Sequence, residues 1–460
     1  MFAPDTYRAR RAALARALAA AGGGGLALVP GNAEAPMNYR ANAYPFWQDG
    51  TFRYLAGDGR ADLALALDAD TGAATLYGDD PTLDDIVWTG PMPSVREIAG
   101  AAGIEHTAPL ARFAADADAA RASGRTAHTL PAYRPEHRVG DRAPAPSEAF
   151  IRAVVALREV KTGEEIAEIE DALSVTGDAF RAALSATAPG RFERDVAGPV
   201  HGVVQGAGRH LAYGLICTVR GETLHNTAYH RPLRDGDLLL MDGGAASPRG
   251  YASDLTRTWP VTGRFTGLQR HLYDTVRAAH DAAVAAMRPG VPYADVHRLA
   301  ARTLTEGLQA AGFMTGDLDA SVEAGAHALF FPHGLGHQMG LDVHDMEALG
   351  EAFVGYDART RRSEQFGTAY LRMARPLREG HVVTVEPGLY VIPDLIAQWQ
   401  AERRHADFIA YDRMGALDGF GGIRLETNVL VTADGARELM PSRGLPLPMD
   451  ADTLAAMVGA

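Results

Sequence analysis

Two aspartates stand on either side of a sequence that favours a turn. Asp242 ends the apolar run Leu238–Met241, and Asp254 follows the turn signal Ser-Pro-Arg-Gly. Pro248 lies midway between the two aspartates, so a simple hairpin would place their side chains opposite each other, about 5 Å apart. Two like charges held that close are costly unless a cation lies between them. The alternative is a solvated hairpin in which the two aspartates are incidental.

Three histidines lie in a glycine-rich segment further along the chain. His333, His337 and His344 belong to the sequence FFPHGLGHQMGLDVHD, whose glycines prevent a regular helix and allow close backbone packing. The helical zinc motif His-Glu-x-x-His does not occur in the chain. Taken alone, three loop histidines are more often surface or hydrogen-bonded residues than metal or substrate ligands.

Two glutamates occupy apolar strands. Glu386 ends the predicted strand His381–Glu386, and Glu426 lies inside the predicted strand Ile423–Val431. A glutamate in such surroundings is rarely buried without a partner. Arg424 shares a strand face with Glu426, but residues two apart in a strand contact each other poorly.

Together these segments offer four carboxylates and one imidazole, from Asp242, Asp254, His337, Glu386 and Glu426. Four negative charges match two divalent cations. A set of oxygen ligands with one nitrogen suits Mn²⁺, Co²⁺ or Zn²⁺ better than a metal that prefers thiolates. Two such ions about 4 Å apart would hold a bridging hydroxide and polarise a carbonyl group. The residues therefore predict hydrolysis with two divalent metal ions as cofactors.

Five ordered motifs carry a resemblance to a known family: LLLMDGG, YASDLTRT, HGLGHQMGLDVHD, VTVEPGLY and FGGIRLETNVLVT. They resemble the pita-bread metallopeptidases, in the Xaa-Pro branch that includes aminopeptidase P and prolidase. The segment YPFWQDGTFRYLAG, residues 44–57, is similar to the smaller N-terminal domain of that branch. The resemblance implies an α/β N-terminal domain with its linker at residues 1–160. It also implies an α+β pita-bread (creatinase/aminopeptidase) catalytic domain at residues 161–460.

The resemblance implies a role for each site residue. Asp254 and Glu426 would bridge the two metal ions. Asp242 would complete the ligands of one ion, and His337 with Glu386 those of the other. Glu386 would also be the general base. The remaining residues would surround the substrate, with oxyanion stabilisation from His225, His333 and His344 and substrate binding by Arg372 and Arg424.

The implied function is that of an Xaa-Pro aminopeptidase, which cleaves the bond between an N-terminal residue and proline, with manganese as the expected ion. Its expected partners are peptides with proline in the second position, and a homodimer is a further implication. A strict Xaa-Pro dipeptidase (prolidase) is the alternative, favoured by Arg372 and by a helical insertion at residues 395–407, whereas residues 44–57 favour aminopeptidase P. Remoter alternatives on the same fold are a creatinase-like amidinohydrolase and a non-catalytic interaction protein. Neither has a reason to keep all five metal ligands.

The elements that must position these residues differ between the two halves of the chain. In residues 1–140, short strands alternate with helices, which is typical of an α/β domain. The expected strands are Leu26–Val29, Thr51–Ala56, Leu63–Leu67 and Ala74–Tyr77. Prolines in Tyr133–Ser147 indicate a linker. A capping-box spacing at Thr162 and Glu165 then opens a long helix. Later helices accompany β-branched or leucine-rich strands, which indicates long helices laid over an antiparallel sheet.

The composition excludes several classes of function. The chain has 460 residues, with 44 Lys and Arg against 57 Asp and Glu, and a net charge of −13. This balance argues against nucleic acid or an anionic membrane as partner, since either needs clustered basic residues. The chain has no run of about 20 apolar residues, so no membrane span is predicted. The N-terminus lacks the apolar core of a secretory signal, and Cys217 is the only cysteine. We therefore expect a cytoplasmic protein without a thiolate metal site.

Overall fold

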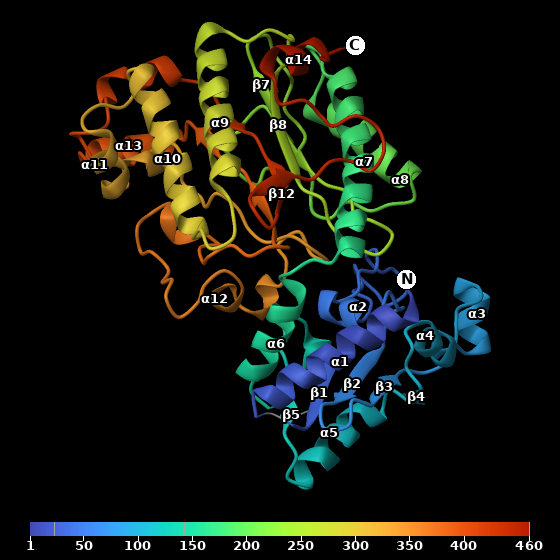
Figure 1. Ribbon diagram of the computed structural model, residues 1–460. Helices are drawn as coiled ribbons and strands as arrows, with labels where there is room; N and C mark the ends of the chain where they lie inside the picture. The colour runs from blue at the N-terminus through green and yellow to red at the C-terminus, as the bar shows by residue number, and fades with distance from the viewer. Residues whose placement is uncertain (23, 141–143, 460) are drawn as a thin grey trace. The chain divides into compact units, whose positions relative to one another are not determined.

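A computed structural model describes residues 1–460 except 23, 141–143 and 460. By its internal contacts the chain divides into two compact units (Figure 1). The first unit holds residues 1–159 and 346–354, and the second holds residues 160–345 and 355–460. The expected boundaries, 1–160 and 161–460, did not include the return of residues 346–354 to the first unit. Within that unit this segment forms η3 (Glu347–Leu349) and α12 (Glu351–Val354), and α12 packs against α6 (Glu148–Arg158).

The first unit is built on one mixed five-stranded sheet. Its strands are β1 (Leu26–Pro30), β2 (Ala64–Asp68), β3 (Ala74–Tyr77), β4 (His106–Ala108) and β5 (Ala127–His128). They lie in the order β4-β3-β2-β1-β5. The three central strands pair antiparallel, whereas β4 and β5 join the edges as parallel strands. The helices, besides α6 and α12, are α1 (Pro4–Ala20), α2 (Gly50–Ala56), α3 (Leu83–Thr89), α4 (Val95–Ala101), α5 (Arg112–Ala122) and the 3-10 turn η1 (Pro135–His137). Part of the expected linker, residues 141–143, lies outside the described residues.

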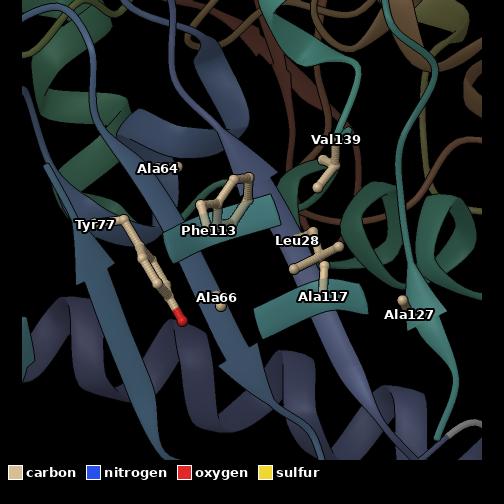
Figure 2. Close-up of a cluster of buried hydrophobic side chains, with 8 residues drawn as sticks. All are labelled: Leu28, Ala64, Ala66, Tyr77, Phe113, Ala117, Ala127 and Val139. Atoms are coloured by element: carbon tan, nitrogen blue, oxygen red, sulfur yellow. The ribbon is translucent and has the colours of Figure 1, made fainter. Parts of the chain in front are cut away.

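A hydrophobic core of this unit lies between the sheet and α5. Figure 2 shows Phe113 and Ala117 of α5 over Leu28, Ala64 and Tyr77 of three neighbouring strands. The rings of Tyr77 and Phe113 are tilted against each other at a centroid distance of 5.2 Å, a favourable arrangement for aromatic pairs. A helix covering a face of the sheet agrees with the α/β class expected for this half.

The predicted strand Thr51–Ala56 is wrong, because these residues belong to helix α2. The side chain of Asp49 accepts a hydrogen bond from the backbone N–H of Phe52 and so caps the helix. Gly57 ends it with a φ of 81°, a value that favours glycine. The threonine and aromatic residues of this segment suggested a strand, but the cap and the terminal glycine favour one short helix.

The second unit combines long helices with three small antiparallel sheets. Its strands are β6 (Ile216–Thr218), β7 (Leu238–Gly243), β8 (Leu255–Pro260), β9 (Val382–Val385), β10 (Gly388–Tyr390), β11 (Gly422–Arg424), β12 (Thr427–Val431) and β13 (Ala436–Glu438). The sheets have the orders β6-β7-β8, β13-β12-β9 and β10-β11. This content confirms the α+β class expected for the second half.

Four long helices of the second unit pack as two pairs, and shorter helices accompany them. They are α7 (Gly163–Ala186), α8 (Glu193–Gly206), α9 (Gly267–Ala286), α10 (Tyr293–Ala310), α11 (Leu318–Ala324), α13 (Pro393–Ala401) and α14 (Ala451–Ala456), with 3-10 turns η2 (Ala326–Leu329), η4 (Thr368–Tyr370) and η5 (Tyr411–Leu417). Figure 1 shows α9 beside α10 and α7 beside α8. The capping box predicted at Thr162 and Glu165 is confirmed by both of its hydrogen bonds. Among the described residues, no helix combines the length and the hydropathy that crossing a lipid bilayer requires.

The predicted strand Ile423–Val431 is two strands that belong to different sheets. β11 pairs with β10, whereas β12 pairs with β9 and β13. Glu426 lies at the break, where its backbone N–H donates to the carbonyl oxygen of Thr256 in β8 at 3.1 Å. Both halves are rich in strand-forming residues, so the sequence does not reveal the break. The change of sheet places Glu426 directly beside β8.

β7 and β8 form the expected hairpin with a different register. Asp242 lies opposite Thr256 rather than opposite Asp254. The loop is centred beyond Pro248, and Gly250 adopts a φ of 82° within it. Asp254 is therefore a diagonal neighbour of Asp242, a relation that still leaves the two side chains within reach of a common partner.

Candidate metal centre

One cavity of the second unit is lined by every residue that the sequence singled out for chemistry. Its volume is about 660 Å³. The predicted residues in its wall are His225, Asp242, Asp254, His333, His337, His344, Arg372, Glu386, Arg424 and Glu426. We call it the metal-centre cavity. β7, β8, the β9–β10 junction and the β11–β12 break each bring one carboxylate to it, so the sheets position the predicted ligands.

Three of the predicted ligands form a compact group. Asp254, His337 and Glu426 each offer a ligand atom, and these atoms all lie within 4.8 Å of one another. The Nε2 atom of His337 lies 3.6 Å from Oδ2 of Asp254 and 3.7 Å from Oε1 of Glu386. The Nδ1 atom of His337 lies 3.1 Å from the carbonyl oxygen of Gln338, which can only accept, so Nδ1 carries the hydrogen. The lone pair of Nε2 therefore faces carboxylate oxygens.

Neutral donors and one arginine hold the carboxylates in place. The hydroxyl of Tyr213 lies 2.6 Å from Oδ1 of Asp242 and also within hydrogen-bond reach of Oδ1 of Asp254, so one hydrogen serves two acids. Arg424 donates from Nη2 to the other oxygen of Asp242 at 2.6 Å. Thr256 donates to Oε2 of Glu426 at 2.6 Å. These contacts fix the carboxylate orientations in the way that metal ligands require.

Burial and mutual repulsion act together on the acids. Burial raises the pKa of Asp254 well above its ordinary value, and the charge of Asp242 adds to the effect. Burial likewise raises the pKa of Glu426, with repulsion from Asp254, and the pKa of Glu386, with repulsion from Glu426. Only two arginines, Arg372 and Arg424, are among the described residues of the cavity wall.

This donor set fits divalent cations. Clustered buried carboxylates disfavour their ionised forms unless positive charge is supplied, and a lone pair aimed at carboxylate oxygens needs a cation between them. Oxygen ligands with one imidazole suit Mn²⁺, Co²⁺ or Zn²⁺. The residues that would hold the ions are the five predicted ones.

The histidine His333 lies in a hydrogen-bonded chain behind the carboxylates. Its Nδ1 donates to the carbonyl oxygen of Gly334 at 2.8 Å, and its Nε2 accepts from the hydroxyl of Tyr390 at 2.8 Å. Tyr390 in turn accepts from Nη1 of Arg424 at 2.9 Å. Burial and the nearby Arg424 lower the pKa of His333 to about 3, so the ring is neutral. Both nitrogens of His333 are thus engaged by the protein.

The other two predicted histidines have different surroundings. The ring of His344 packs against that of His337 at a centroid distance of 4.0 Å, tilted by 46°. His225 lies on the loop after β6, and burial together with Arg424 lowers its pKa below the ordinary value. Arg424 is only 4% exposed and donates to Asp242, Tyr390 and Thr256. This geometry supports a positioning role for Arg424 better than the substrate contact expected from the sequence.

Several polar residues of the site were missed by sequence reasoning. Thr256, Thr384 and Asn428 each stand two positions from a predicted ligand, and alternate residues of a strand share a face. That spacing could have identified all three. Thr384 donates to Oε1 of Glu386 at 3.3 Å, and the amide of Asn428 bonds the backbone N–H and C=O of Asp254. Tyr213 carried no such signal, because it lies in a loop far from the ligand motifs.

Comparison with known proteins agrees with this geometry. Residues 167–433 match metallopeptidase family M24. The chain belongs to that family. Residues 7–127 match the N-terminal domain of aminopeptidase P. The family predicted from the sequence is thereby confirmed, and with it the metallopeptidase class.

Relatives of two kinds are found among family M24 proteins. The chain is 34% identical to human Xaa-Pro dipeptidase over 61% of its own length and 57% of that protein. It is 30% identical to a probable Xaa-Pro aminopeptidase of Botryotinia fuckeliana, over 85% of this chain and 84% of the relative. The structure of Escherichia coli aminopeptidase P superposes with a TM-score of 0.79 at 26% identity and covers 100% of this chain and 98% of that one. This similarity confirms the pita-bread fold.

Proposed function

We propose that this M24 protein is a metal-dependent exopeptidase that hydrolyses the bond between an N-terminal residue and proline. The observation that carries the proposal is the meeting of all five predicted ligands in one cavity of an M24 chain. The match of residues 7–127 to the N-terminal domain of aminopeptidase P supports an aminopeptidase. The substrates would be peptides with proline in the second position.

The proposed ligands are Asp242, Asp254, His337, Glu386 and Glu426, and manganese is the proposed ion, with zinc or cobalt as alternatives. Two bound divalent ions would supply an activated water and polarise the scissile carbonyl group. The hydrogen bonds from Tyr213, Thr256 and Thr384 would keep the carboxylate oxygens oriented.

Glu386 is the proposed general base and takes a proton from the attacking water. It ends β9 at the cavity wall, and its side chain is 17% exposed, so it is open to a substrate. Thr384 holds Oε1 of this carboxylate. A base must reach the proton that it abstracts, and a partly exposed carboxylate held by one oxygen meets that need.

The histidines are proposed to bind the substrate and to stabilise the developing oxyanion. His225 and His344 line the cavity, and an imidazole ring presents at least one N–H donor. His333 would join them only by exchanging its bond with Tyr390 or Gly334 for one with the substrate. Arg372, also in the wall, is proposed to bind a substrate carboxylate.

A strict Xaa-Pro dipeptidase is the second candidate. Arg372 in the cavity wall favours it, because a dipeptide places its own carboxylate next to the proline. Human Xaa-Pro dipeptidase is also among the relatives. The two candidates differ in whether the chain after proline is accepted.

The deciding experiment compares hydrolysis of Xaa-Pro with Xaa-Pro-Xaa peptides by the Mn²⁺-loaded enzyme. An aminopeptidase turns over the tripeptide and releases its first residue. Turnover of the dipeptide alone would replace the aminopeptidase by the dipeptidase. Hydrolysis of neither peptide by enzyme that contains two metal ions per chain would overturn the proposed activity.

The proposal extends to compartment and assembly. The buried Cys217 supports a reducing compartment such as the cytoplasm. A homodimer is proposed from the resemblance of the N-terminal half, and light scattering of the purified protein would test it.

A further inference from the structure

A second cavity lies in the same unit as the metal centre. Its volume is about 300 Å³. Its walls come from α10, α11, η2 and the segment 356–374. The two cavities have no lining residue in common. We call this one the histidine cavity.

Two buried histidines give the cavity its character. His297 of α10 and His327 of η2 are each 3% exposed, and their ring centroids lie 6.4 Å apart. Within the described residues, no atom meets hydrogen-bond geometry to any of their four ring nitrogens. The backbone of Val322 favours the protonated form of His327 and so offsets part of the effect of burial on its pKa. Buried polar atoms without partners are rare in native proteins, because their desolvation is not compensated.

Both imidazoles are neutral at physiological pH. Burial, together with the neighbouring His327, lowers the pKa of His297 to about 3. Burial also lowers the pKa of His327 to about 4. A neutral imidazole offers one N–H donor and one acceptor. The pair therefore presents two donors and two acceptors to whatever occupies the cavity.

The rim of the cavity carries positive charge. Arg361 is exposed and has no ion pair within the described part of the chain, whereas Arg298 pairs with Asp295 at 2.8 Å. Glu323 is the one acidic residue among the lining residues. An unpaired guanidinium favours a carboxylate, which can accept two parallel hydrogen bonds from it.

The remaining wall is partly apolar, with Ser363, Gln365 and Thr368 as its other polar residues. Ala301, Val322 and Leu371 line the cavity together with the ring of Tyr356. The hydroxyl of Tyr356 is already used, since it donates to the carbonyl oxygen of Leu371 at 2.5 Å. Water alone would leave these surfaces hydrated, whereas a small organic molecule covers them.

The arrangement does not suit a metal ion. Among the described residues, the one group of three close metal-type ligands lies in the metal-centre cavity, and neither His297 nor His327 belongs to it. The arginines at the rim would also repel a cation.

We propose that the histidine cavity is a binding site for a small organic carboxylate that carries a second hydrogen-bonding group. The carboxylate pairs with Arg361 at the rim. The second group reaches the ring nitrogens of His297 and His327, and the body of the molecule covers the apolar wall.

This site is close to the metal centre but separate from it. The ring of Phe331 lies 5.3 Å from that of His297 on one side and 4.9 Å from that of His333 on the other. Along residues 368–372, Thr368 and Leu371 face the histidine cavity, whereas Tyr370 and Arg372 face the metal-centre cavity. The proposal does not depend on the peptidase activity.

Calorimetric titration of the metal-loaded full chain with 4-hydroxybenzoate tests the site. This probe has a carboxylate and a hydroxyl group on a rigid apolar body. We expect one molecule per chain with a dissociation constant near or below about 1 mM. Arg361→Gln is expected to weaken binding at least about fivefold, because it removes a charge-assisted hydrogen bond. Arg359→Gln, an exposed arginine outside the lining, is the matched control and is expected to bind as the unmodified chain does.

Further arms locate the bound molecule. Asp254→Ala, in the other cavity, is expected to leave the affinity unchanged, whereas His297→Gln lowers it. The neutral analogue 4-hydroxybenzamide and the hydroxyl-free analogue benzoate are both expected to bind more weakly than the probe. Absence of binding at millimolar concentration, loss of binding in Asp254→Ala, or equal affinity of the Arg361→Gln and Arg359→Gln variants would overturn the proposal. Because Arg361 is exposed, its replacement is expected to leave the fold intact, which a thermal melt verifies.

Discussion

The two cavities of the second unit both contain buried histidines, but they differ in whether the polar side chains have hydrogen-bond partners. In the metal-centre cavity, His333 has protein partners on both ring nitrogens, and Asp242 has a donor on each oxygen. In the histidine cavity, His297 and His327 have no hydrogen-bond partner within the described residues. The first cavity has an oriented set of ligands, and the second has donors and acceptors that are still unsatisfied.

The difference shows what each cavity needs from outside. The metal-centre cavity is rich in acceptors and negative charge, so its deficit is positive charge. The histidine cavity has neutral imidazoles inside and an arginine, Arg361, at its rim. Within the described part of the chain, the imidazoles lack hydrogen-bond partners, and Arg361 lacks a carboxylate. Hydrogen-bonded ligands make a site specific for one kind of ion, whereas unsatisfied rings point to an organic occupant.

The largest effect is expected from Asp254→Ala, which removes a ligand from the compact group of three. We expect kcat/KM on an Xaa-Pro peptide to fall by at least about a thousandfold, because metal binding contributes several kcal/mol of transition-state stabilisation. Metal content, measured by mass spectrometry after dialysis, is expected to fall as well. Asp274→Ala on the exposed face of α9 is the control, since Asp274 only pairs with Arg270. Normal turnover of Asp254→Ala would remove the distinction between the cavities.

A smaller effect is expected from Tyr213→Phe, which removes the hydroxyl shared by Asp242 and Asp254. The carboxylates stay in place but lose the bond that orients them. Metal affinity is expected to fall about 10- to 100-fold, as for other groups that hold metal ligands. Competition with a chelator of known affinity measures this change. If Tyr213→Phe binds metal as tightly as the unmodified chain, the hydroxyl does not orient the ligands, and the carboxylates position themselves.

The sequence was sufficient to predict the fold class and the carboxylates, histidines and arginines that line the metal-centre cavity. Asp242, Glu386 and Glu426 could be found because an acid at the end of or inside an apolar strand is unusual. Asp254 could be found because it lies across a predicted turn from Asp242. The hairpin register was not accessible, since moving its centre beyond Pro248 alters no strand pattern. The break at Glu426 was likewise hidden, because a chain that changes sheets keeps its strand-forming composition.

The histidine cavity lay beyond sequence reasoning altogether. His297 sits on the buried face of an amphipathic helix, where a histidine normally finds a hydrogen-bond partner in the core. Only the packing of α10 against η2 and the segment 356–374 shows that the partner is absent. A pattern reports which face is buried, but not whether a polar atom on that face is satisfied.

Metal addition tests whether the need for a cation is confined to the first cavity. We expect Mn²⁺ at 100 times its dissociation constant to stabilise the chelator-treated chain by about 2.7 kcal/mol for each bound ion, because the ion binds only the folded state. The unfolding midpoint, followed by calorimetry with and without the ion, measures this gain. His297→Gln is expected to show the same gain and Asp254→Ala none. A reduced gain in His297→Gln would mean that the histidine cavity also takes the metal.

The smallest effect concerns acid stability, where the neutral rings of the histidine cavity matter. In the unfolded chain a histidine has a pKa near 6.5, whereas His297 and His327 stay neutral in the fold down to about pH 3 and 4. The unfolded state therefore binds more protons below pH 6.5, so stability present above that pH is lost as the pH falls. As the pH falls from 6.5 to 5.5, each ring is expected to lower the free energy of unfolding by about 1 kcal/mol.

The double variant His297→Gln/His327→Gln isolates this term, because glutamine keeps polar atoms in the cavity and does not titrate. We expect its unfolding free energy in urea to fall by about 2 kcal/mol less than that of the unmodified chain over the same pH interval. Charges that face the rings, from Arg298, His333 and His405, are kept in both proteins and cancel in the difference. If the free energies of unfolding of the two proteins fall in parallel with pH, the rings take up protons in the folded state. An anion in the cavity would then be held by imidazolium charge rather than by neutral donors.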